Sequence, residues 1–216
     1  LTEAAHSVGA YAGFDCAHAA GNIKMALHDW NVDFAAWCTY KYLNSSPGGV
    51  SGVFVHEKHG NNPDTPRLAG WWGHKESERF QMKKGFIPEP GAAGWQLSNA
   101  PVLAMAAHKA SLDMFDEVGM DALVAKGKLL NTFLEHVVMD AQASNDKLEF
   151  EIITPAERGC QLSMLTNENG KALFDYLTER DVIADWRQPN VIRLAPVPMY
   201  NSFMDVWEFG ELLKGF

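Results

Sequence analysis

The sequence predicts an α/β protein in two parts, residues 1–118 and residues 119–216. Its 216 residues exceed one typical domain of roughly 150 residues and are enough to bury a sizeable core. In the first part, short apolar runs that end on polar residues lie ahead of a long irregular stretch, which indicates buried strands followed by a functional loop. In the second part, short strands and helices alternate after a long helix, which is typical of a compact α+β unit.

Three apolar runs in the first part are expected to be strands: residues 10–15, 33–40 and 49–56. The first run ends on Asp15 and the second is followed by Lys41, so each strand has a polar residue at its exit. The chain opens on what looks like a helix in progress, with no initiator Met and no signal peptide. We therefore expect the sequence to be a piece of a longer protein.

The region between residues 59 and 94 is rich in Gly, Pro and aromatic side chains and predicts a long irregular loop. Asn99 and Pro101 predict the start of a helix that runs towards Gly119, and a second helix is expected over residues 120–141. The second part is then expected to continue as strand 150–154, strand 161–165, helix 171–180, strand 182–185, strand 191–195 and helix 204–213.

Composition and charge argue against several functions. With 18 basic and 27 acidic residues, the net charge of −9 argues against binding to nucleic acid or to an anionic membrane. The longest apolar run, residues 102–107, is far shorter than the roughly 20 residues that span a bilayer. Three cysteines without a C-x-x-C pair indicate a reducing, cytoplasmic setting. His56 and His59 lack further ligands at a suitable spacing, so we expect no metal site.

Asp15 and Lys41 are the first candidates for chemistry. Ligands of open α/β sheets bind at the carboxyl ends of the strands, and both residues follow predicted strands that would end at one edge. A carboxylate there can pair with a pyridinium nitrogen, and a lysine can form a Schiff base with an aldehyde cofactor. Together they indicate a site for pyridoxal phosphate, although solvated caps at two strand ends would show the same pattern.

Six segments carry a close resemblance to the kynureninase family, in that family's order and at similar spacing. They are residues 13–22 (GFDCAHAAGN), 37–44 (WCTYKYLN), 70–74 (GWWGH), 97–101 (LSNAP), 158–162 (RGCQL) and 192–201 (IRLAPVPMYN). The resemblance implies an α/β fold made of the C-terminal half of a fold-type I, transferase-like large domain plus a small α+β C-terminal domain. It implies PLP-dependent hydrolysis of L-kynurenine or 3-hydroxy-L-kynurenine to anthranilate or 3-hydroxyanthranilate and L-alanine, in tryptophan catabolism and NAD biosynthesis.

The resemblance also implies roles for individual residues. Lys41 would hold the cofactor as a Schiff base and then move the substrate's Cα proton, and Asp15 would keep the cofactor's ring nitrogen protonated. His18 would lie against the cofactor, while Tyr40 would bind its phosphate and serve as a proton donor in the carbon–carbon cleavage. Arg193 would grip the substrate's α-carboxylate, because a guanidinium matches the two oxygens of that group.

The remaining candidates are implied to act at an interface between two copies of the chain. Trp71 and Asn99 would reach the cofactor phosphate of the neighbouring subunit, so a homodimer with shared active sites is expected. Trp72, His74 and Ser98 would contact the aromatic half of the substrate. Trp71 and Trp72 would alternatively fill a core, and Arg193 would alternatively form a structural ion pair.

The sequence differs from the family chiefly in length. A complete member has roughly as many residues again before the position that corresponds to residue 1. We therefore expect the isolated chain to be inactive, because most phosphate donors and the ring-stacking group belong to the N-terminal half. Two alternatives remain: a related fold-type I desulfurase or aminotransferase, and a non-catalytic fragment that needs a separate N-terminal half.

Overall fold

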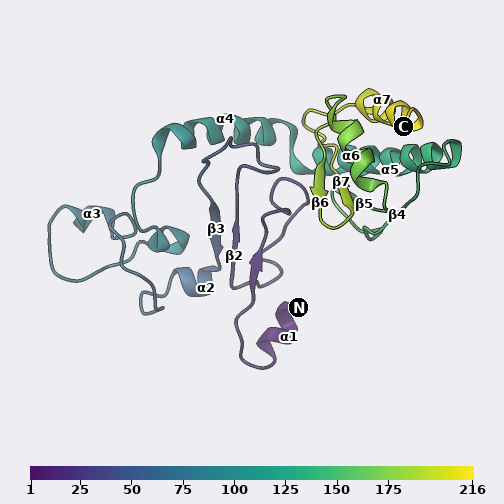
Figure 1. The fold of residues 1–216 in the computed structure, drawn as a ribbon. Coiled ribbons are helices and arrows are strands. Elements are labelled where there is room, and N and C mark those ends of the chain that lie inside the picture. The colour runs from purple at the N-terminus through teal and green to yellow at the C-terminus, as the bar shows by residue number, and fades with distance from the viewer. The chain divides into compact units, whose positions relative to one another are not determined.

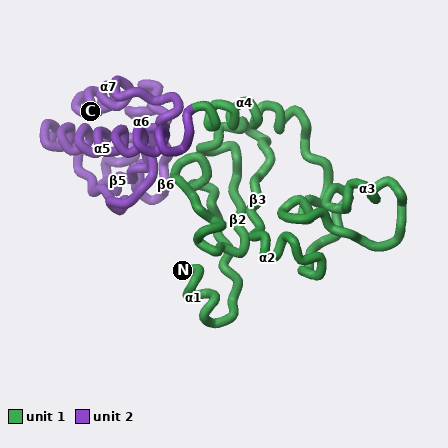
Figure 2. The backbone as a smooth tube through the Cα atoms, turned by 180° about the vertical axis from the view of Figure 1, so that it is seen from behind, with its two compact units in different colours: residues 1–117 green, residues 118–216 purple.

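The computed structural model describes residues 1–216, which divide into two compact units, residues 1–117 and residues 118–216 (Figure 2). Each unit contains its own sheet, of three strands in the first and four in the second (Figure 1). None of the helices is both long and apolar enough to cross a membrane.

The first unit contains the three strands that the apolar runs predict, in shorter form. Strands β1 (Gly13–Asp15), β2 (Phe34–Trp37) and β3 (Gly52–Val55) lie in the order β1-β2-β3. Strand β2 is parallel to β1 and antiparallel to β3. Because β1 and β2 are parallel neighbours, their carboxyl ends meet at one edge of the sheet.

Helix α1 (Thr2–His6) confirms the expectation of a helix at the start of the chain. The stretch expected to be irregular contains three short helical segments, namely α2 (Glu57–Gly60), α3 (Glu76–Arg79) and the 3-10 helix η1 (Gly91–Trp95). Each is only four or five residues long, which is too short for a helical apolar period to show in the sequence.

Helices α4 (Val102–Val118) and α5 (Met120–Ser144) are close to the two predicted long helices. Gly119 separates them with a φ of 80°, a backbone conformation that glycine adopts without strain. On α4, the Ser111 hydroxyl donates a hydrogen bond of 2.7 Å to the Leu43 carbonyl and so anchors the helix beside the turn that follows β2.

The second unit is an antiparallel sheet in the order β4-β5-β7-β6, with α5 and two further helices. Its other elements are β4 (Phe150–Ile152), β5 (Leu162–Thr166), α6 (Gly170–Thr178), β6 (Asp185–Arg187), β7 (Val191–Leu194) and α7 (Phe203–Lys214). The prediction of a strand at 182–185 was wrong for most of its length. The Ile183 side chain in that run is fully exposed, and pairing with β7 begins only at Asp185.

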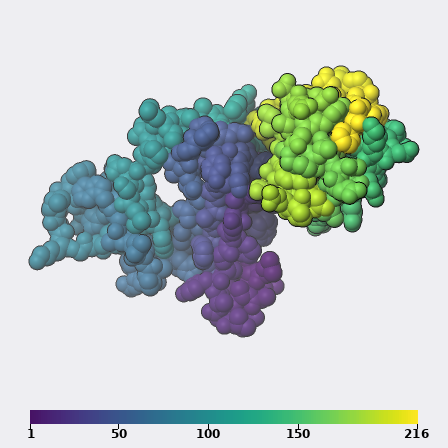
Figure 3. Space-filling view, in the orientation of Figure 1, coloured from purple at the N-terminus to yellow at the C-terminus, as the bar shows by residue number.

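Most of the fully buried apolar side chains lie in the second unit. Helices α5, α6 and α7 pack on one face of its sheet, around side chains such as Leu130, Leu177 and Ile192, each with no exposed surface. The core of the first unit is far smaller and centres on Cys16, Val32 and Ala35. In the space-filling view the second unit, in green to yellow, is closely packed, whereas the segment between α2 and α4 forms an open loop (Figure 3).

Candidate active site

Asp15, Tyr40 and Lys41 line one cavity of about 580 Å³ at the carboxyl ends of β1 and β2. Asp15 is the last residue of β1, and the other two lie in the turn that follows β2. Apolar walls come from Phe14 and Trp37, on the two strands themselves. The parallel pairing of β1 with β2 therefore brings together an acid, a phenol and an amine that are 26 positions apart at their extremes.

The Asp15 carboxylate is oriented by the chain that follows it. Its Oδ1 accepts a hydrogen bond of 2.8 Å from the backbone N–H of Ala17, as in the turns that Asp commonly forms. Gly21, with a φ of 78°, then lets the loop approach Tyr42, because a Cβ at this position would lie 2.9 Å from the Tyr42 carbonyl carbon. The exposed His18 ring lies edge-on to Tyr42 at 6.1 Å, and His18 does not line the cavity.

Two buried hydroxyl groups stabilise the turn that carries Tyr40 and Lys41. The Thr39 hydroxyl donates to the Val50 carbonyl at 2.6 Å and lies 2.7 Å from the Ser45 hydroxyl. Both side chains are almost completely buried. Since unpaired buried hydroxyls are costly, this pair fixes the path of the chain on either side of Lys41.

Cys38 lies beside Tyr40 and changes its acidity. A hydrogen bond with the Cys38 side chain favours the protonated phenol and raises the pKa of Tyr40. The Cys38 thiol also donates to the Ala17 carbonyl at 3.7 Å, so it links the turn after β2 to the loop after β1. Alternation along an extended chain was the signal that places Cys38 and Tyr40 on one side, and sequence analysis did not use it.

The other candidate residues of the first unit lie in a second cluster, formed by residues 70–74 and 94–99. The two segments pack backbone to backbone, because a Cβ on Gly70 would lie 2.4 Å from Leu97 Cα and one on Gly73 would lie 2.8 Å from the Gln96 carbonyl oxygen. This approach requires glycine at both positions. It brings the turn that carries Trp71, Trp72 and His74 close to the segment that leads into Ser98 and Asn99.

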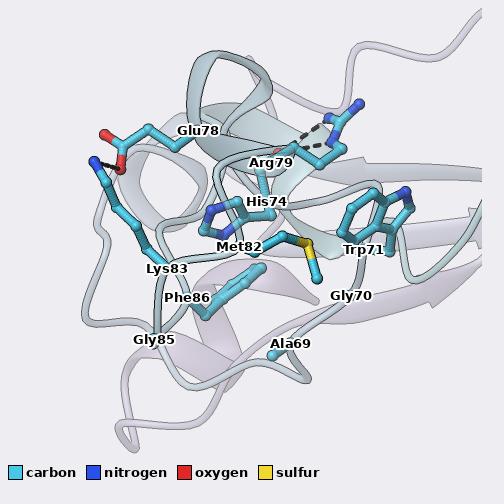
Figure 4. Close-up of a pocket in the computed structure, with 10 residues that line it drawn as sticks. All are labelled: Ala69, Gly70, Trp71, His74, Glu78, Arg79, Met82, Lys83, Gly85 and Phe86. Atoms are coloured by element: carbon cyan, nitrogen blue, oxygen red, sulfur yellow. Dashed lines mark hydrogen bonds and ion pairs between the residues drawn. The ribbon is translucent and has the colours of Figure 1, made fainter.

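Trp71 and His74 line a cavity of about 340 Å³ beside α3, together with Arg79 and Phe86 (Figure 4). His74 is held by its Nδ1, which accepts a hydrogen bond of 3.1 Å from the Ile87 N–H. Trp72 does not line this cavity, and Ser98 and Asn99 are exposed outside it. No residue lines both this cavity and the one around Lys41.

Arg193 lies in the second unit, on β7, and forms an ion pair in this structure. Asp185 stands directly opposite it on β6 and accepts hydrogen bonds from its Nε and Nη2 atoms. The same carboxylate lies 2.9 Å from the Arg187 Nε. The Arg193 guanidinium is thus held by a cross-strand partner, and the sequence pattern did not identify that partner.

His56 and His59 each have a polar partner within the chain. His56 caps α2 by accepting a hydrogen bond from the Lys58 N–H, and the His59 Nε2 lies 2.7 Å from the buried Asp33 carboxylate. The chain holds no group of three or more His, Cys, Asp or Glu side chains placed to bind a metal ion.

Arg79 is a residue of the second cluster that the sequence analysis missed. Within the run KESER it looks like one more charge on a solvated helix, but only 7% of its surface is exposed. Its partners are carbonyl groups of Trp72 and His74. No sequence pattern that we used signals such contacts.

The fold is that of pyridoxal-phosphate enzymes of fold type I. A cysteine desulfurase from Thermococcus onnurineus NA1 superposes with a TM-score of 0.75 at 13% identity, over 99% of this chain and 54% of that one. An alanine–glyoxylate aminotransferase from Nostoc sp. superposes with a TM-score of 0.69 at 14% identity, over 99% of this chain and 55% of that one. The enzyme C-DES, with glycine linked to its PLP cofactor, gives 0.74 at 15% identity, over 92% and 50%.

The chain is similar to kynureninases along nearly its whole length. Residues 123–213 match the family model of the kynureninase C-terminal domain. The kynureninase of Flavobacterium johnsoniae is 56% identical over 99% of this chain and 51% of its own length. The kynureninase of Christiangramia forsetii is 55% identical over the same shares. The chain thus spans about half the length of the curated relatives it matches.

Proposed function

We propose that this chain is part of an enzyme that hydrolyses L-kynurenine, or its 3-hydroxy derivative, to anthranilate or 3-hydroxyanthranilate and L-alanine. The observation that carries the proposal is that Asp15, Tyr40 and Lys41 line one cavity. Identities above 50% to proteins named kynureninase support the choice of substrate. The reaction places the elements of water across the Cβ–Cγ bond, with the hydroxyl on the carbonyl carbon and the proton on Cβ.

The cavity around Lys41 fits pyridoxal phosphate by its size and by its chemistry. Its volume of about 580 Å³ lies within the usual range of small-ligand sites. Lys41 offers an amine for an aldehyde, Asp15 a carboxylate for a ring nitrogen and Tyr40 a hydroxyl for a phosphate. When bound, the cofactor supplies an electron sink for the substrate's Cα.

Each side chain then has a defined task. Lys41 holds the cofactor through its amine and, once released, carries the proton that leaves Cα. Asp15, oriented by the Ala17 N–H, stabilises a protonated ring nitrogen. Tyr40 carries a phenol proton at neutral pH, as an ordinary tyrosine with a pKa of about 10 does, and it donates that proton to Cβ as the bond breaks.

Substrate recognition is proposed to use the other candidates. Arg193 binds the α-carboxylate, and its bonds to Asp185 hold the guanidinium in a fixed orientation. Trp72, His74 and Ser98 contact the aromatic half of the substrate. Trp71 and Asn99, both exposed, reach the cofactor phosphate of a second copy in a homodimer.

A desulfurase is the rival activity suggested by the shared fold. Such an enzyme needs a nucleophilic, accessible cysteine. Cys16 and Cys160 are buried, and burial raises the pKa of Cys16 and raises that of Cys160 to about 11. Cys38 is half-buried between Tyr40 and the Ala17 carbonyl. These environments favour the hydrolase.

The test uses a protein of the relatives' full length that contains this chain, loaded with pyridoxal phosphate. Reduction with borohydride followed by peptide mapping should label Lys41, and L-kynurenine should yield fluorescent anthranilate. Lys41→Ala should abolish both signals, whereas Lys24→Ala should retain them. Label on Lys24 or Lys58, or release of sulfur from cysteine in place of anthranilate, would contradict the proposal.

A further inference from the structure

We propose that Arg79 is a positioning residue that fixes Trp72 and His74 for selection of the substrate's aromatic ring. This inference rests on the proposed function, because it takes those two residues to contact the ring. Arg79 ends α3 and lies at the edge of the cavity that His74 and Trp71 also line (Figure 4).

The Arg79 guanidinium holds the turn from two directions. Its Nη2 donates to the Trp72 carbonyl at 2.8 Å and to the His74 carbonyl at 3.0 Å, and its Nε lies 3.3 Å from the His74 carbonyl. Its central carbon lies 4.3 Å from the centre of the Trp72 ring. One flat group therefore fixes the backbone on both sides of Gly73 and also the plane of the Trp72 indole.

The charge of Arg79 has no carboxylate partner in the chain. The adjacent Glu78 pairs with Lys83 at 3.5 Å, and Arg79 forms no ion pair although it is 93% buried. A buried cation is costly unless hydrogen bonds and polarisable groups replace its hydration. The two carbonyls and the indole face supply this environment, and lysine, a compact charge without a planar fork, could not satisfy all three.

On the side away from Arg79, the turn that contains Gly73 packs directly against backbone atoms. Arg79 is therefore the side chain whose replacement can change the position of this turn. Gly73 packs against the carbonyl oxygens of Gln96 and Gly94, at 2.8 Å and 2.9 Å from where its Cβ would lie. With that side fixed, loss of the Arg79 bonds frees the Trp72 ring and the His74 carbonyl while the packing of Gly73 is retained. Release of this kind changes the shape of the ring site and leaves the Lys41 cavity untouched.

The experiment compares Arg79→Gln and Arg79→Lys in the holoprotein of the relatives' full length. Arg67→Gln is the matched control, since Arg67 also stacks on an indole, that of Trp95 at 3.8 Å, but donates to the carbonyls of Thr65 and Asn62. The measurement is kcat/KM for L-kynurenine and for 3-hydroxy-L-kynurenine, which differ only in the ring. A displacement of about 1 Å can lower the catalytic rate by about 100-fold. We therefore expect both Arg79 variants to change the ratio of the two kcat/KM values by about 10-fold or more, mainly through KM. The control should keep the wild-type ratio.

A spectroscopic arm separates this inference from the proposed function. Acrylamide quenches the fluorescence of exposed tryptophans, and the difference in quenching between the wild type and Trp72→Phe gives the part due to Trp72. Arg79→Gln should increase the quenching of Trp72, and this readout does not require enzymatic activity. A wild type without anthranilate production would overturn the proposed function alone. Equal losses for both substrates with unchanged Trp72 quenching would overturn the positioning role. Failure of both Arg79 variants to fold would also overturn it, since Arg79 would then be a folding residue.

Discussion

Asp33 shows how much one buried side chain can organise in the first unit. Its carboxylate accepts one hydrogen bond of 2.7 Å from the Ala12 N–H. The same carboxylate lies 2.7 Å from each of three side-chain nitrogens, those of His6, Lys58 and His59. Burial opposes the charge of Asp33, but these bonds outweigh it and hold the pKa of this carboxyl well below its usual range. The residue thus ties α1 and α2 to the start of β2.

We expect Asp33→Asn to lower the free energy of unfolding of the first unit by about 3 kcal/mol at pH 7. Because the pKa of Asp33 is lowered on folding, the unfolded chain binds more protons below about pH 4. The contribution of Asp33 is therefore complete above that pH and is lost progressively as the pH falls towards the pKa of the folded state, so the difference between the variant and the wild type should be smaller at pH 3 than at pH 7. Urea unfolding followed by tryptophan fluorescence measures this difference. Asp29→Asn, at an exposed carboxylate, is the control, and an equal loss in that variant would contradict the assignment.

Arg193→Ala should impair substrate capture in the protein of the relatives' full length. If the guanidinium binds the α-carboxylate through two charge-assisted hydrogen bonds, the loss is about 3 kcal/mol or more in kcat/KM, since each such bond contributes roughly 1.5–3 kcal/mol. Arg187→Ala is matched to it, because Arg187 binds the same Asp185 carboxylate but is much more exposed. Cofactor absorbance should survive in both variants. Comparable losses in the two variants would mean that Arg193 has only a structural role.

At the scale of elements, the turn between β2 and β3 depends on a close approach at Gly49. A Cβ there would lie 1.9 Å from the Ser45 Oγ and 2.9 Å from the Thr39 Oγ1. We expect Gly49→Ala to destabilise the first unit by about 1–3 kcal/mol, the range for overpacked sites, and to displace Tyr40 and Lys41. Adding Ser45→Gly removes the nearest atoms and should recover part of the loss. Urea unfolding of the single and double variants measures the coupling, and strictly additive losses would show that the clash is absent.

Elements with a long apolar period were predictable from the sequence, and elements set by pairing were not. Helix α5 buries Leu123, Leu130 and Leu134 at helical spacing, so the helix is evident in the sequence. Strand β6 was displaced because the apolar Ile183 is exposed, and the register that places Asp185 opposite Arg193 depends on a partner 8 residues away.

The candidate site was also predictable only in part. The edge shared by Asp15 and Lys41 follows from two apolar runs with polar exits. The contacts of Arg79 with two carbonyls depend on the fold of an irregular loop, where no periodicity exists to predict them.

For the whole molecule, we expect the 216-residue chain by itself to show less than a tenth of the kynureninase turnover of a protein of the relatives' full length. The Lys41 cavity is lined from one sheet edge, and Asp15 and Tyr40 are exposed at it. A cofactor site needs convergent support to hold its groups in place, and an exposed edge cannot supply it. Anthranilate fluorescence after addition of pyridoxal phosphate and L-kynurenine measures the turnover. Turnover within about tenfold of the longer protein would show that the chain contains a complete site.

The two units should also unfold separately. The second unit has an extensive core in which α5 and α7 pack closely, since a Cβ on Gly210 would lie only 2.2 Å from Val137 Cγ1. The first unit buries few apolar side chains and should have the lower free energy of unfolding, because buried apolar area is the main favourable contribution to folding. We expect two transitions in urea, the first reported by Trp37 and Trp95 and the second by Trp186 and Trp207.

Residues 118–216 expressed alone should reproduce the second transition with the same midpoint and remain folded without the rest of the chain. Residues 1–117 alone should reproduce the first transition at its lower midpoint, because units that unfold separately do not depend on each other and the small core gives this unit the lower stability. Far-ultraviolet circular dichroism against urea concentration measures both segments beside the whole chain. A single transition in the whole chain, together with an unfolded 118–216 segment, would show that the two units form one cooperative body.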